Sequence, residues 1–570
     1  MRLMISKSKN AQSLYVIKSV YVDGKRTTKV VEKLGTYDAL SKKLGGEDPI
    51  AWAKQYISEL NQQEKAKQSQ ILVKFSPTKQ IKSGKQNSFN GGYLFLQKIY
   101  HELGLHHITS EISDKYKFAF NLDAILSRLL YGRILYPSSK LATYRHASKF
   151  LEPASFDLHQ IYRALEVIAK ETDFIQSSLY ANTLKGAKRN TNVLYYDCTN
   201  YFFEIDREDG LRQYGHSKEH RPNPIVQMGL FMDGDGIPLA FDIHRGNTNE
   251  QTTLIPLEKK ILSDFRHSKF IVCTDAGLAS SANRTFNDRG ERAFITTQSL
   301  KLLKKHLKKW ALDPGGWRLA GTRETFDLAE MDEDRHHENI FFKERWINEN
   351  GLEQKFIVTF SFKYRDYQRS IRQGQIDRAQ RLIDKNPAKL GKKSQNDYRR
   401  LIKKTAYTED GEVAGNSAFR LNEEIIEKES AYDGFYGVCT NLEDEAGQII
   451  KVNQKRWEIE ECFRIMKSEF KARPVFLSRD DRIKAHFTTC FLSLILYRML
   501  EKRLGGVFTC QEIIHGLQEM NFHEIDREGY LPSYTRNRFT DALHDAFGFR
   551  TDYQIIKMAD MKKIQRSTRK

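Results

Sequence analysis

The sequence predicts an α/β protein with additional modules before and within its core. Residues 192–204 form a strand-length run rich in β-branched and aromatic side chains. Residues 191–300 alternate such runs with helical patterns, and residues 91–188 and 448–502 repeat apolar side chains at helical spacing. The first run also carries Asp197. A carboxylate within a buried strand is costly unless a cation meets it, so Asp197 is the first candidate functional residue.

Composition narrows the class of partner. The 570 residues predict roughly two to four domains. The net charge of +19 predicts a polyanionic partner, nucleic acid before a membrane surface. No apolar run approaches the ~20 residues that span a bilayer, and no signal peptide is visible. The six cysteines include no Cys-x-x-Cys pair, so we expect reduced core thiols in a cytosolic protein and no zinc site.

The N-terminal part predicts a hairpin followed by helices. Residues 13–34 have two alternating runs separated by Asp23-Gly24, a strong hairpin signal. Lys25, Arg26 and Lys29 cluster near the turn, either as a solvated tip or as a DNA contact. Residues 38–70 are polar with a helical pattern broken near 45–48, and 79–90 is expected to be a linker. Residues 91–188 predict helices that form either a DNA-end reader or a packing domain.

The order of elements in residues 191–300 predicts an RNase H-like core. The strand with Asp197 comes first, and the strands 225–232 and 239–243 follow as an antiparallel meander joined by a turn. A helix over 249–265, a strand ending at Asp275, a short helix near 281–287 and a strand over 293–297 complete the group.

Residues 300–440 interrupt this pattern with an insertion that is partly β. One helical face is expected to carry Lys301, Lys304, Lys305, Lys308 and Lys309, as a solvated face or a phosphate contact. Strands are expected at 339–347, 355–362 and 434–440, with a basic helical stretch over 363–404.

A second informative helix is predicted over 448–471. Its core stripe is Ile459, Phe463, Met466 and Phe470. An adjacent stripe carries Arg456, Glu460, Arg464, Lys467 and Lys471. A core helix over 480–502 and a small mixed appendage with a basic tail follow. The expected domain boundaries are 1–80, 81–190, 191–300, 301–440, 441–510 and 511–570.

Asp197, Asp275 and Glu460 are suited to phosphodiester chemistry with two divalent ions. Carboxylates that hold ions ~3.5–4 Å apart can stabilise both the attacking and the leaving oxygen. Each acid also has an ordinary alternative role. Asp197 could be a hydrogen-bonded strand residue, Asp275 a helix N-cap, and Glu460 an ion-pair partner of Arg456 or Arg464 four residues away.

Asn453-x-x-Arg456-x-x-x-Glu460-x(6)-Lys467 resembles the Y-R-E-K signature of DDE-type insertion-sequence transposases. That signature is Tyr, two residues, Arg, three residues, Glu, six residues and Lys, and three of its four positions match here. Similar blocks occur between about residues 120 and 505: Tyr196-Asp197-Cys-Thr199, Gly215-His-Ser-Lys218, Gly246-Asn247-Thr248 and Thr274-Asp275-Ala-Gly277.

The resemblance implies an RNase H-like core with a largely β insertion before the Glu-bearing helix. It implies that Asp197, Asp275 and Glu460 are catalytic and bind Mg²⁺ or Mn²⁺, and that Arg456 and Lys467 bind phosphate. Asn453 stands where the family has Tyr, yet it can still donate a hydrogen bond. Further DNA contacts are expected at Arg464, Lys301, Lys304, Lys305 and Lys308. Relatives can stack a Trp of the insertion on a flipped base, for which Trp317 and Trp346 are candidates, although either could be a packing residue.

The expected function is that of a DNA transposase that binds the terminal inverted repeats of a mobile element and joins them to target DNA. A homodimer is expected when two ends are synapsed, in a prokaryotic, cytoplasmic and nucleoid-associated protein with no membrane contact. An RNase H-like nuclease without joining activity and a catalytically inactive DNA-binding inhibitor of transposition remain alternatives.

Overall fold

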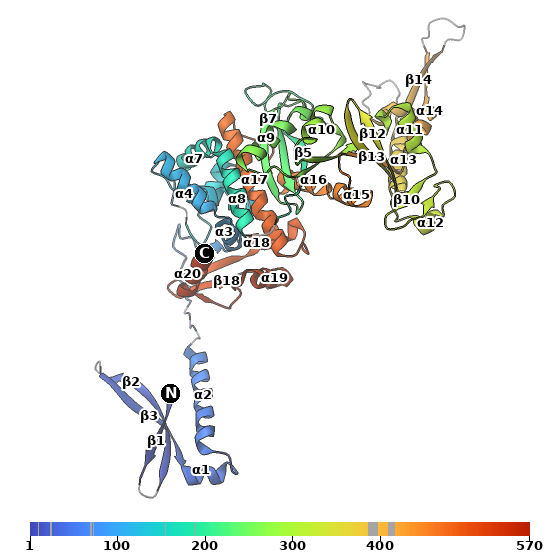
Figure 1. Ribbon diagram of the computed structural model, residues 1–570. Helices are drawn as coiled ribbons and strands as arrows, with labels where there is room; N and C mark the ends of the chain where they lie inside the picture. The colour runs from blue at the N-terminus through green and yellow to red at the C-terminus, as the bar shows by residue number, and fades with distance from the viewer. Residues whose placement is uncertain are drawn as a thin grey trace. The chain divides into compact units, whose positions relative to one another are not determined.

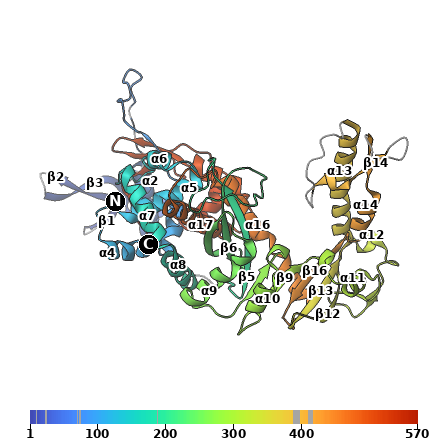
Figure 2. The ribbon, with the colours of Figure 1, turned by 90° about the horizontal axis from the view of Figure 1, so that it is seen from above.

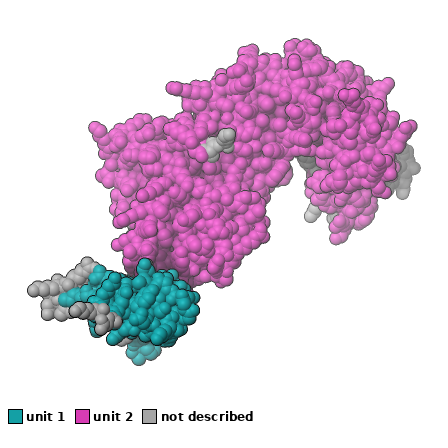
Figure 3. Space-filling model, turned by 60° about the horizontal axis from the view of Figure 1, so that its bottom comes forward, with its two compact units in different colours: residues 1–85, 525–529 teal, residues 86–524, 530–570 magenta. Residues whose placement is uncertain are grey.

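Two parts of the chain fold as separate compact units. The computed structural model describes residues 1–8, 11–22, 25–68, 71, 73, 75–153, 155–186, 189–385, 397–407 and 416–570. The first unit comprises residues 1–85 with 525–529, and the second comprises 86–524 with 530–570 (Figure 3). No helix among the residues described is long and apolar enough to span a bilayer.

The first unit contains an antiparallel sheet and two helices in its described part. The strands β1 (Arg2–Lys7), β2 (Gln12–Val22) and β3 (Lys25–Thr36) pair in that order. The predicted hairpin is confirmed as β2 and β3, although its turn at Asp23-Gly24 lies outside the described residues. The sequence analysis missed β1. The helices α1 (Tyr37–Lys43) and α2 (Pro49–Gln68) are separated at the predicted break.

The centre of the second unit is a large mixed sheet (Figures 1 and 2). In the described part of the chain it has ten strands in the order β11-β10-β12-β13-β16-β9-β8-β5-β6-β7. The strands of the predicted core are β5 (Val193–Phe202), β6 (Ile225–Asp233), β7 (Pro238–Arg245), β8 (Ile271–Thr274) and β9 (Ala293–Gln298). β5, β6 and β7 are antiparallel, whereas β5, β8 and β9 are parallel. The predicted meander and the strand order that follows it are confirmed.

Helices cover both faces of this core. On one face Leu194, Tyr196 and Cys198 of β5 pack with α9 (Leu254–Asp264). The alternate residue Tyr195 donates a hydrogen bond to the Val452 carbonyl of α15 (Ala446–Gln454), on the other face. Because Asp197 shares the alternation of Tyr195, its side chain is directed toward the face of α15 and α16 (Trp457–Arg464).

The insertion continues the core sheet. Its elements are α11 (Lys305–Leu312), β10 (Trp317–Leu319), β11 (Thr325–Phe326), α12 (Glu333–His336), β12 (Phe341–Glu349), β13 (Leu352–Phe360), α13 (Phe362–Lys385), β14 (Ile402–Tyr407), β15 (Asn416–Leu421), α14 (Glu423–Ser430) and β16 (Phe435–Thr440). β16 lies between β9 and β13, so β10, β11, β12, β13 and β16 extend the same sheet, whereas β14 and β15 form a separate antiparallel pair. The basic helix predicted over 363–404 ends at Lys385, and Lys392 and Lys393 lie outside the described residues.

The predicted lysine stripe on one continuous helix is wrong. Lys301 lies in a separate single-turn helix, Leu300–Leu302, and Leu303 is extended. Lys304 caps α11, so only Lys305, Lys308 and Lys309 are inside it. Leu303 and Leu307 are buried in the insertion core, and the extended backbone at Leu303 and Lys304 separates Lys301 from α11.

The helix predicted over 448–471 is three segments. α15 ends at Gln454, α16 begins at Trp457, and a π-helical turn over Ile465–Glu469 follows. The predicted core stripe of Ile459, Phe463, Met466 and Phe470 is buried as expected. Asn453 therefore belongs to a different helix from Glu460. Arg456, the N-cap of α16, still pairs with Glu460 one turn further along, as the predicted stripe requires for these two residues.

The helices before the sheet share a core with a helix that follows it. They are α3 (Tyr93–Glu102), α4 (Leu105–Tyr116), α5 (Leu122–Leu135), α6 (Lys140–Ala147), α7 (Leu158–Lys170) and α8 (Thr172–Gly186). α17 (Asp480–Arg503) packs against α3, α5, α7, α8 and β7. The helices α3 to α8 and α17 thus contribute to one hydrophobic core. All six cysteines are buried and free, as the predicted core thiols require.

The C-terminal appendage forms a β-sheet with β4 (Ser88–Asn90), a strand near the start of the second unit. It contains α18 (Cys510–Glu519), β17 (Asn521–Ile525), β18 (Gly529–Pro532), α19 (Arg538–Phe547), β19 (Ile556–Lys557) and α20 (Met558–Ser567). β4 pairs with β17. The predicted basic tail is largely the helix α20.

Candidate active site

Two parallel strands bring Asp197 and Asp275 to one edge of the sheet. Tyr195 of β5 lies opposite Cys273 of β8. Two residues further along, Asp197 lies beside Asp275, which follows β8 directly. Asp275 also accepts a hydrogen bond from the Leu278 N–H at 3.1 Å, so the capping role considered from the sequence is present. That bond uses one carboxylate oxygen and leaves the other available.

Asp197 has less positive charge around it than a buried carboxylate needs. Burial raises its pKa to about 7, and Asp275 raises it further. Lys218, the backbone N–H of Cys198 and Arg456 oppose this shift without cancelling it. Additional positive charge at this point would favour the ionised form. A cation beside Asp197 and Asp275 would supply it, and carboxylate oxygens are the donors that Mg²⁺ and Mn²⁺ prefer.

Arg456 interacts electrostatically with Glu460 and with both aspartates. Its Nη1 lies 3.7 Å from Oε1 of Glu460. Burial lowers the pKa of Arg456, but Tyr436, Asp275, Glu460 and Asp197 together raise it above its usual value. All three predicted acids are therefore within electrostatic reach of one guanidinium.

The three acids are not drawn together around a single point. In the described part of the chain, the only three Asp, Glu, His or Cys residues with ligand atoms all within 4.8 Å of one another are Asp541, His544 and Asp552. The Glu460 side chain instead pairs with Arg456 and is 60% exposed. Joint coordination of an ion by the three acids would require Glu460 to leave Arg456.

Lys467 lies at the same end of β5. Its Nζ donates a hydrogen bond to Thr199 Oγ1 at 2.6 Å. Burial, with the neighbouring Lys218, lowers the pKa of Lys467 to about 8. The π-helical turn that carries Lys467 has an extra residue per turn, and such turns are frequent at functional sites. Arg464, by contrast, pairs with Glu461 at 2.5 Å and Glu469 at 3.6 Å.

Asn453 is paired with a tyrosine from another element. The Asn453 side chain is buried, and its Nδ2 donates a hydrogen bond to the Tyr436 hydroxyl at 3.4 Å. The same hydroxyl lies 2.6 Å from Thr297 Oγ1. Tyr436 belongs to β16 and also raises the pKa of Arg456. The sequence analysis missed Tyr436, because nothing along the chain distinguishes it from other strand aromatics.

Lys218 is the second residue that the sequence analysis did not assign. Its Nζ donates to the Cys198 carbonyl and lies 3.2 Å from Oε1 of Glu250. Burial lowers the pKa of Lys218, but Asp197 and Glu250 raise it more, so the residue stays cationic. The signal that could have identified Lys218 was the block Gly215-His-Ser-Lys218. This block resembles the transposase pattern, but no role was assigned to its lysine.

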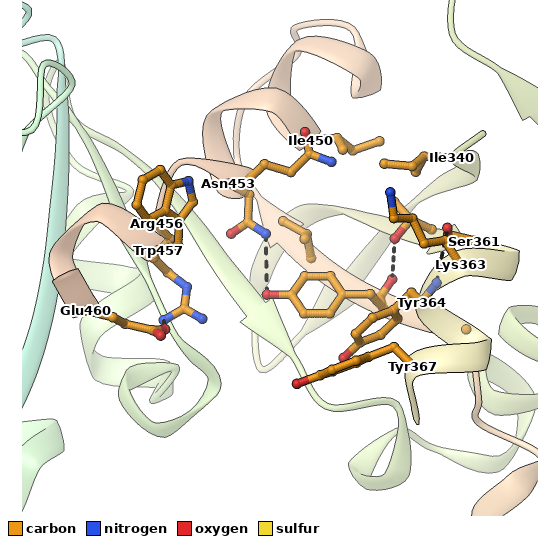
Figure 4. A pocket seen from close by; sticks show the side chains of 15 residues that line it. Ile340, Ser361, Lys363, Tyr364, Tyr367, Ile450, Asn453, Arg456, Trp457 and Glu460 are labelled. Carbon is orange, nitrogen blue, oxygen red and sulfur yellow. Dashed lines mark hydrogen bonds and ion pairs between the residues drawn. The ribbon is translucent and has the colours of Figure 1, made fainter. Parts of the chain in front are cut away.

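A cavity of about 560 Å³ adjoins these charged groups. Figure 4 shows Arg456, Trp457 and Glu460 on one side of it and Tyr364 and Tyr367 of α13 on the other. Tyr436 and Asn453 also line the cavity. Three tyrosines and a tryptophan that is 62% exposed make its wall strongly aromatic.

The tryptophans considered from the sequence do not line this cavity. Trp317 is fully buried and donates its indole N–H to the Asp313 carbonyl at 2.9 Å, so it is a packing residue. Trp346 is partly exposed and lies under Lys355, whose Nζ is 5.7 Å from the ring centre. Among the lysines of the insertion, Lys301 lies over the Tyr432 ring, and Lys304, Lys305 and Lys309 are exposed.

The cluster of Asp541, His544 and Asp552 does not suit a metal ion. Arg550 donates to both carboxylates, at 3.1 Å to Asp541 and 2.7 Å to Asp552. The Thr551 N–H donates to His544 Nε2 at 3.1 Å, which leaves the proton on Nδ1, 3.7 Å from Asp552. The cluster is therefore an ion-pair network without a free imidazole lone pair.

Comparisons with known proteins relate the chain to transposases. A family model described as the transposase DDE domain matches residues 202–496, more than half of the 570 residues. The match contains Asp275 and Glu460 and begins just after Asp197. Among solved structures, the chain is similar to the piggyBac transposase in a synaptic complex with hairpin DNA, with 8% identity and a TM-score of 0.37, over 85% of this chain and 88% of that one. It is also similar to the Mos1 transposase in a paired-end complex with the left transposon end, with 14% identity and a TM-score of 0.13, over 40% of this chain and 62% of that one. No curated protein matches it.

Proposed function

We propose, from the premise that this chain belongs to the transposase DDE domain family, that it is the DNA transposase of an insertion sequence. It binds the terminal inverted repeats of its element, cuts the DNA there and joins the ends to target DNA. The observation that supports this most is that Asp197, Asp275 and Glu460 all act electrostatically on Arg456. Acids that are 185 residues apart along the chain, as Asp275 and Glu460 are, share one charged site.

Asp197, Asp275 and Glu460 would hold Mg²⁺ or Mn²⁺. The donor set consists of oxygen atoms alone, and the raised pKa of Asp197 records a deficit of positive charge at that point. When bound, a pair of such ions neutralises the scissile phosphate and stabilises the attacking and leaving oxygens. The nucleophiles are water and then the 3′-hydroxyl of the cut end, so no protein side chain has to form a covalent bond. This accounts for the lack of a reactive thiol in a chain whose cysteines are all buried.

The cations around the acids would hold the DNA backbone. Arg456 and Lys467 reach the site from α16 and the π-helical turn, and phosphate contacts fix the register of DNA without reading its sequence. Asn453 and Tyr436 together would replace the single tyrosine of the family signature, with the Tyr436 hydroxyl as the donor to phosphate. Arg464, Lys301, Lys304, Lys305 and Lys308 would contribute contacts further from the acids.

The aromatic cavity would hold a base removed from the duplex. Tyr364, Tyr367 and Trp457 offer ring faces beside Arg456 and Glu460, and a base–aromatic stack contributes ~1–3 kcal/mol. An unstacked base next to the scissile phosphate would free the backbone to enter the site. This assignment replaces Trp317 and Trp346 as the expected base contacts.

The direct test uses the purified chain, duplexes carrying the inverted repeats that flank its reading frame, and Mg²⁺. The proposal expects cut ends and strand-transfer products, both abolished by EDTA. Cutting without joined products would identify a nuclease, and binding without cutting would identify an inhibitor. Either result would contradict the proposed function.

A further inference from the structure

The N-terminal unit carries about half of the chain's surplus positive charge. Residues 1–85 contain 17 Lys and Arg against 7 Asp and Glu, a net charge of +10. The remaining 485 residues contain 75 against 66, a net charge of +9. Residue for residue, a polyanion is therefore attracted far more strongly to this unit than to the rest of the chain.

One face of the sheet in this unit is covered by helices. Leu14 of β2 packs with Leu40 of α1 and Ala53 of α2. Glu32 of β3 accepts a hydrogen bond from the Tyr56 hydroxyl of α2 at 3.1 Å. Leu14 and Glu32 share a face, because the strand partner of Glu32 is two residues beyond Leu14 on β2. α1 and α2 thus occupy the face of Leu14.

The opposite face presents two rows of side chains across the strands. The rows are Met4 with Tyr15 and Lys33, and Arg2 with Ile17 and Val30. Ile17 itself is buried, and the exposed part of the face is formed by the residues around it. Lys33 Nζ lies 5.9 Å from the centre of the Tyr15 ring, which places both on this face. Arg2 and Lys33 are exposed, and Val30 is 49% exposed. The two cations lie on the outer strands β1 and β3, on either side of an apolar and aromatic centre.

We propose that this open face, defined by Arg2, Met4, Tyr15, Val30 and Lys33, binds in the major groove of double-stranded DNA and reads the ends of the element. The proposal rests on the transposase function proposed above. With strands ~4.8 Å apart, the axes of the outer strands lie about 10 Å from each other, so their side chains can reach both edges of a major groove that is about 12 Å wide. Arg2 and Lys33 contact the two phosphate backbones, while Met4 and Val30 contact thymine methyl groups.

The test compares two full-length variants that lose the same charge. Arg2→Gln/Lys33→Gln changes the open face, and Lys170→Gln/Lys259→Gln removes two exposed lysines from α7 and α9 of the other unit. Binding to a duplex DNA carrying the element end is measured over a range of salt concentrations. A duplex RNA of the same sequence is the second probe, because its deep and narrow major groove does not admit a sheet. All four substituted side chains are exposed, and circular dichroism verifies the fold.

The expected result is a rise of about tenfold in Kd for DNA with Arg2→Gln/Lys33→Gln. The salt slope should also fall by about 2, because each substitution leaves one phosphate without its cation. Binding to RNA should change little, and the control variant should bind DNA like the parent chain. Equally weakened binding to DNA and RNA, equally weakened binding by the two variants, or unchanged binding would each overturn the proposal. A parent chain that binds DNA through this face but does not cut it would contradict the transposase function alone.

Discussion

Arg456 is the residue that most directly determines the charge of the candidate site. Its guanidinium pairs with Glu460, and although burial lowers its pKa, Tyr436, Asp275, Glu460 and Asp197 together raise it. In this arrangement Glu460 is an ion-pair partner of Arg456, which was the ordinary role considered from the sequence. The pair does not exclude a catalytic role, because its Glu460 half is exposed to solvent, and solvent-screened ion pairs contribute only ~0–1 kcal/mol.

Tyr436→Phe tests whether a strand residue supplies the hydroxyl that the signature helix lacks. The substitution removes one donor near Arg456 and keeps the ring. We expect the rate of strand cutting at saturating DNA to fall by about tenfold, as for the loss of one charge-assisted hydrogen bond of ~1.5–3 kcal/mol. Tyr364→Phe, which removes a hydroxyl from the same cavity, is the control and should cut at close to the parental rate. Equal cutting rates for Tyr436→Phe and the parent would show that the Tyr436 hydroxyl has no role in DNA cutting.

Lys140 gives a prediction about stability and pH. It is buried, and burial together with Arg133 lowers its pKa from 10.5 to about 7. Between these two values the unfolded chain binds a proton at this position that the folded chain does not. Its contribution to stability therefore rises with pH across this window and is lowest below pH 7.

Lys140→Met removes the cost of burying this charge and keeps most of the hydrocarbon volume. The free energy of unfolding at pH 6.5 should rise by about 4–5 kcal/mol relative to the parent chain, since each unit of the pKa shift corresponds to ~1.4 kcal/mol. The gain should shrink steadily as the pH approaches 10. Urea unfolding of both proteins over this range measures the difference, and a gain independent of pH would show that Lys140 is not the titrating group.

At the scale of elements, the sequence correctly predicted the strands and turns that are determined by local residue patterns. The strand of Asp197, the meander after it and the strand ending at Asp275 were predictable, because period-two runs and turn residues define them without tertiary context. The break between α15 and α16 was not, since Asn453 to Lys467 has a helical period throughout. The separation of Lys301 from α11 was equally unpredictable, because the lysine spacing is helical throughout while the backbone at Leu303 and Lys304 is extended.

The close approach of β5 and β6 gives a prediction about an element. A side chain at Gly229 of β6 would meet the Tyr196 hydroxyl at 2.2 Å. That hydroxyl is buried and lies 2.7 Å from Thr253 Oγ1. Gly229→Ala should therefore lower the free energy of unfolding by about 1–3 kcal/mol and disturb the strand of Asp197.

Gly374→Ala is the matched control, because no atom lies within 4 Å of a side chain there and Gly374 is inside α13. Alanine at an open helical position should stabilise α13 by about 0.5–1 kcal/mol. Differential scanning calorimetry of both variants measures the opposite signs. Equal shifts of the two melting temperatures would contradict the packing of β5 against β6.

At the scale of the whole molecule, the spacing of acidic residues along the chain could not by itself predict which of them belong to one site. The chain has 73 acidic residues. Asp197 and Asp275 were selected by their place in or after apolar strands and Glu460 by its basic helix, and the resemblance to the transposase signature joined the three. The sheet explains how they meet, since β8 is the parallel neighbour of β5 and Asp197 is directed toward α16. Tyr436 and Lys218 reach the site from β16 and from the segment between β5 and β6, and no local pattern specifies such contacts.

The assembly that joins two element ends gives a prediction about the whole molecule. Each chain has a mass of 66.4 kDa and one set of the three acids, so two ends require two chains. Mass photometry of the protein with element-end duplexes should show a complex of two chains and two duplexes. A complex of one chain with both duplexes would contradict the expected dimer.

The central claim is that Asp197 and its two partner acids perform the phosphodiester chemistry. The most direct measurement is the Mg²⁺-dependent cutting rate of Asp197→Asn on element-end duplexes, with the exposed Asp206→Asn as control. We expect Asp197→Asn to cut at least about a thousandfold more slowly, because removing one metal-binding charge costs ~4 kcal/mol or more of transition-state stabilisation. Its Kd for DNA should stay within about twofold of the parent, because phosphate contacts by Lys and Arg dominate affinity. Cutting by Asp197→Asn at the rate of the Asp206→Asn control would contradict the account.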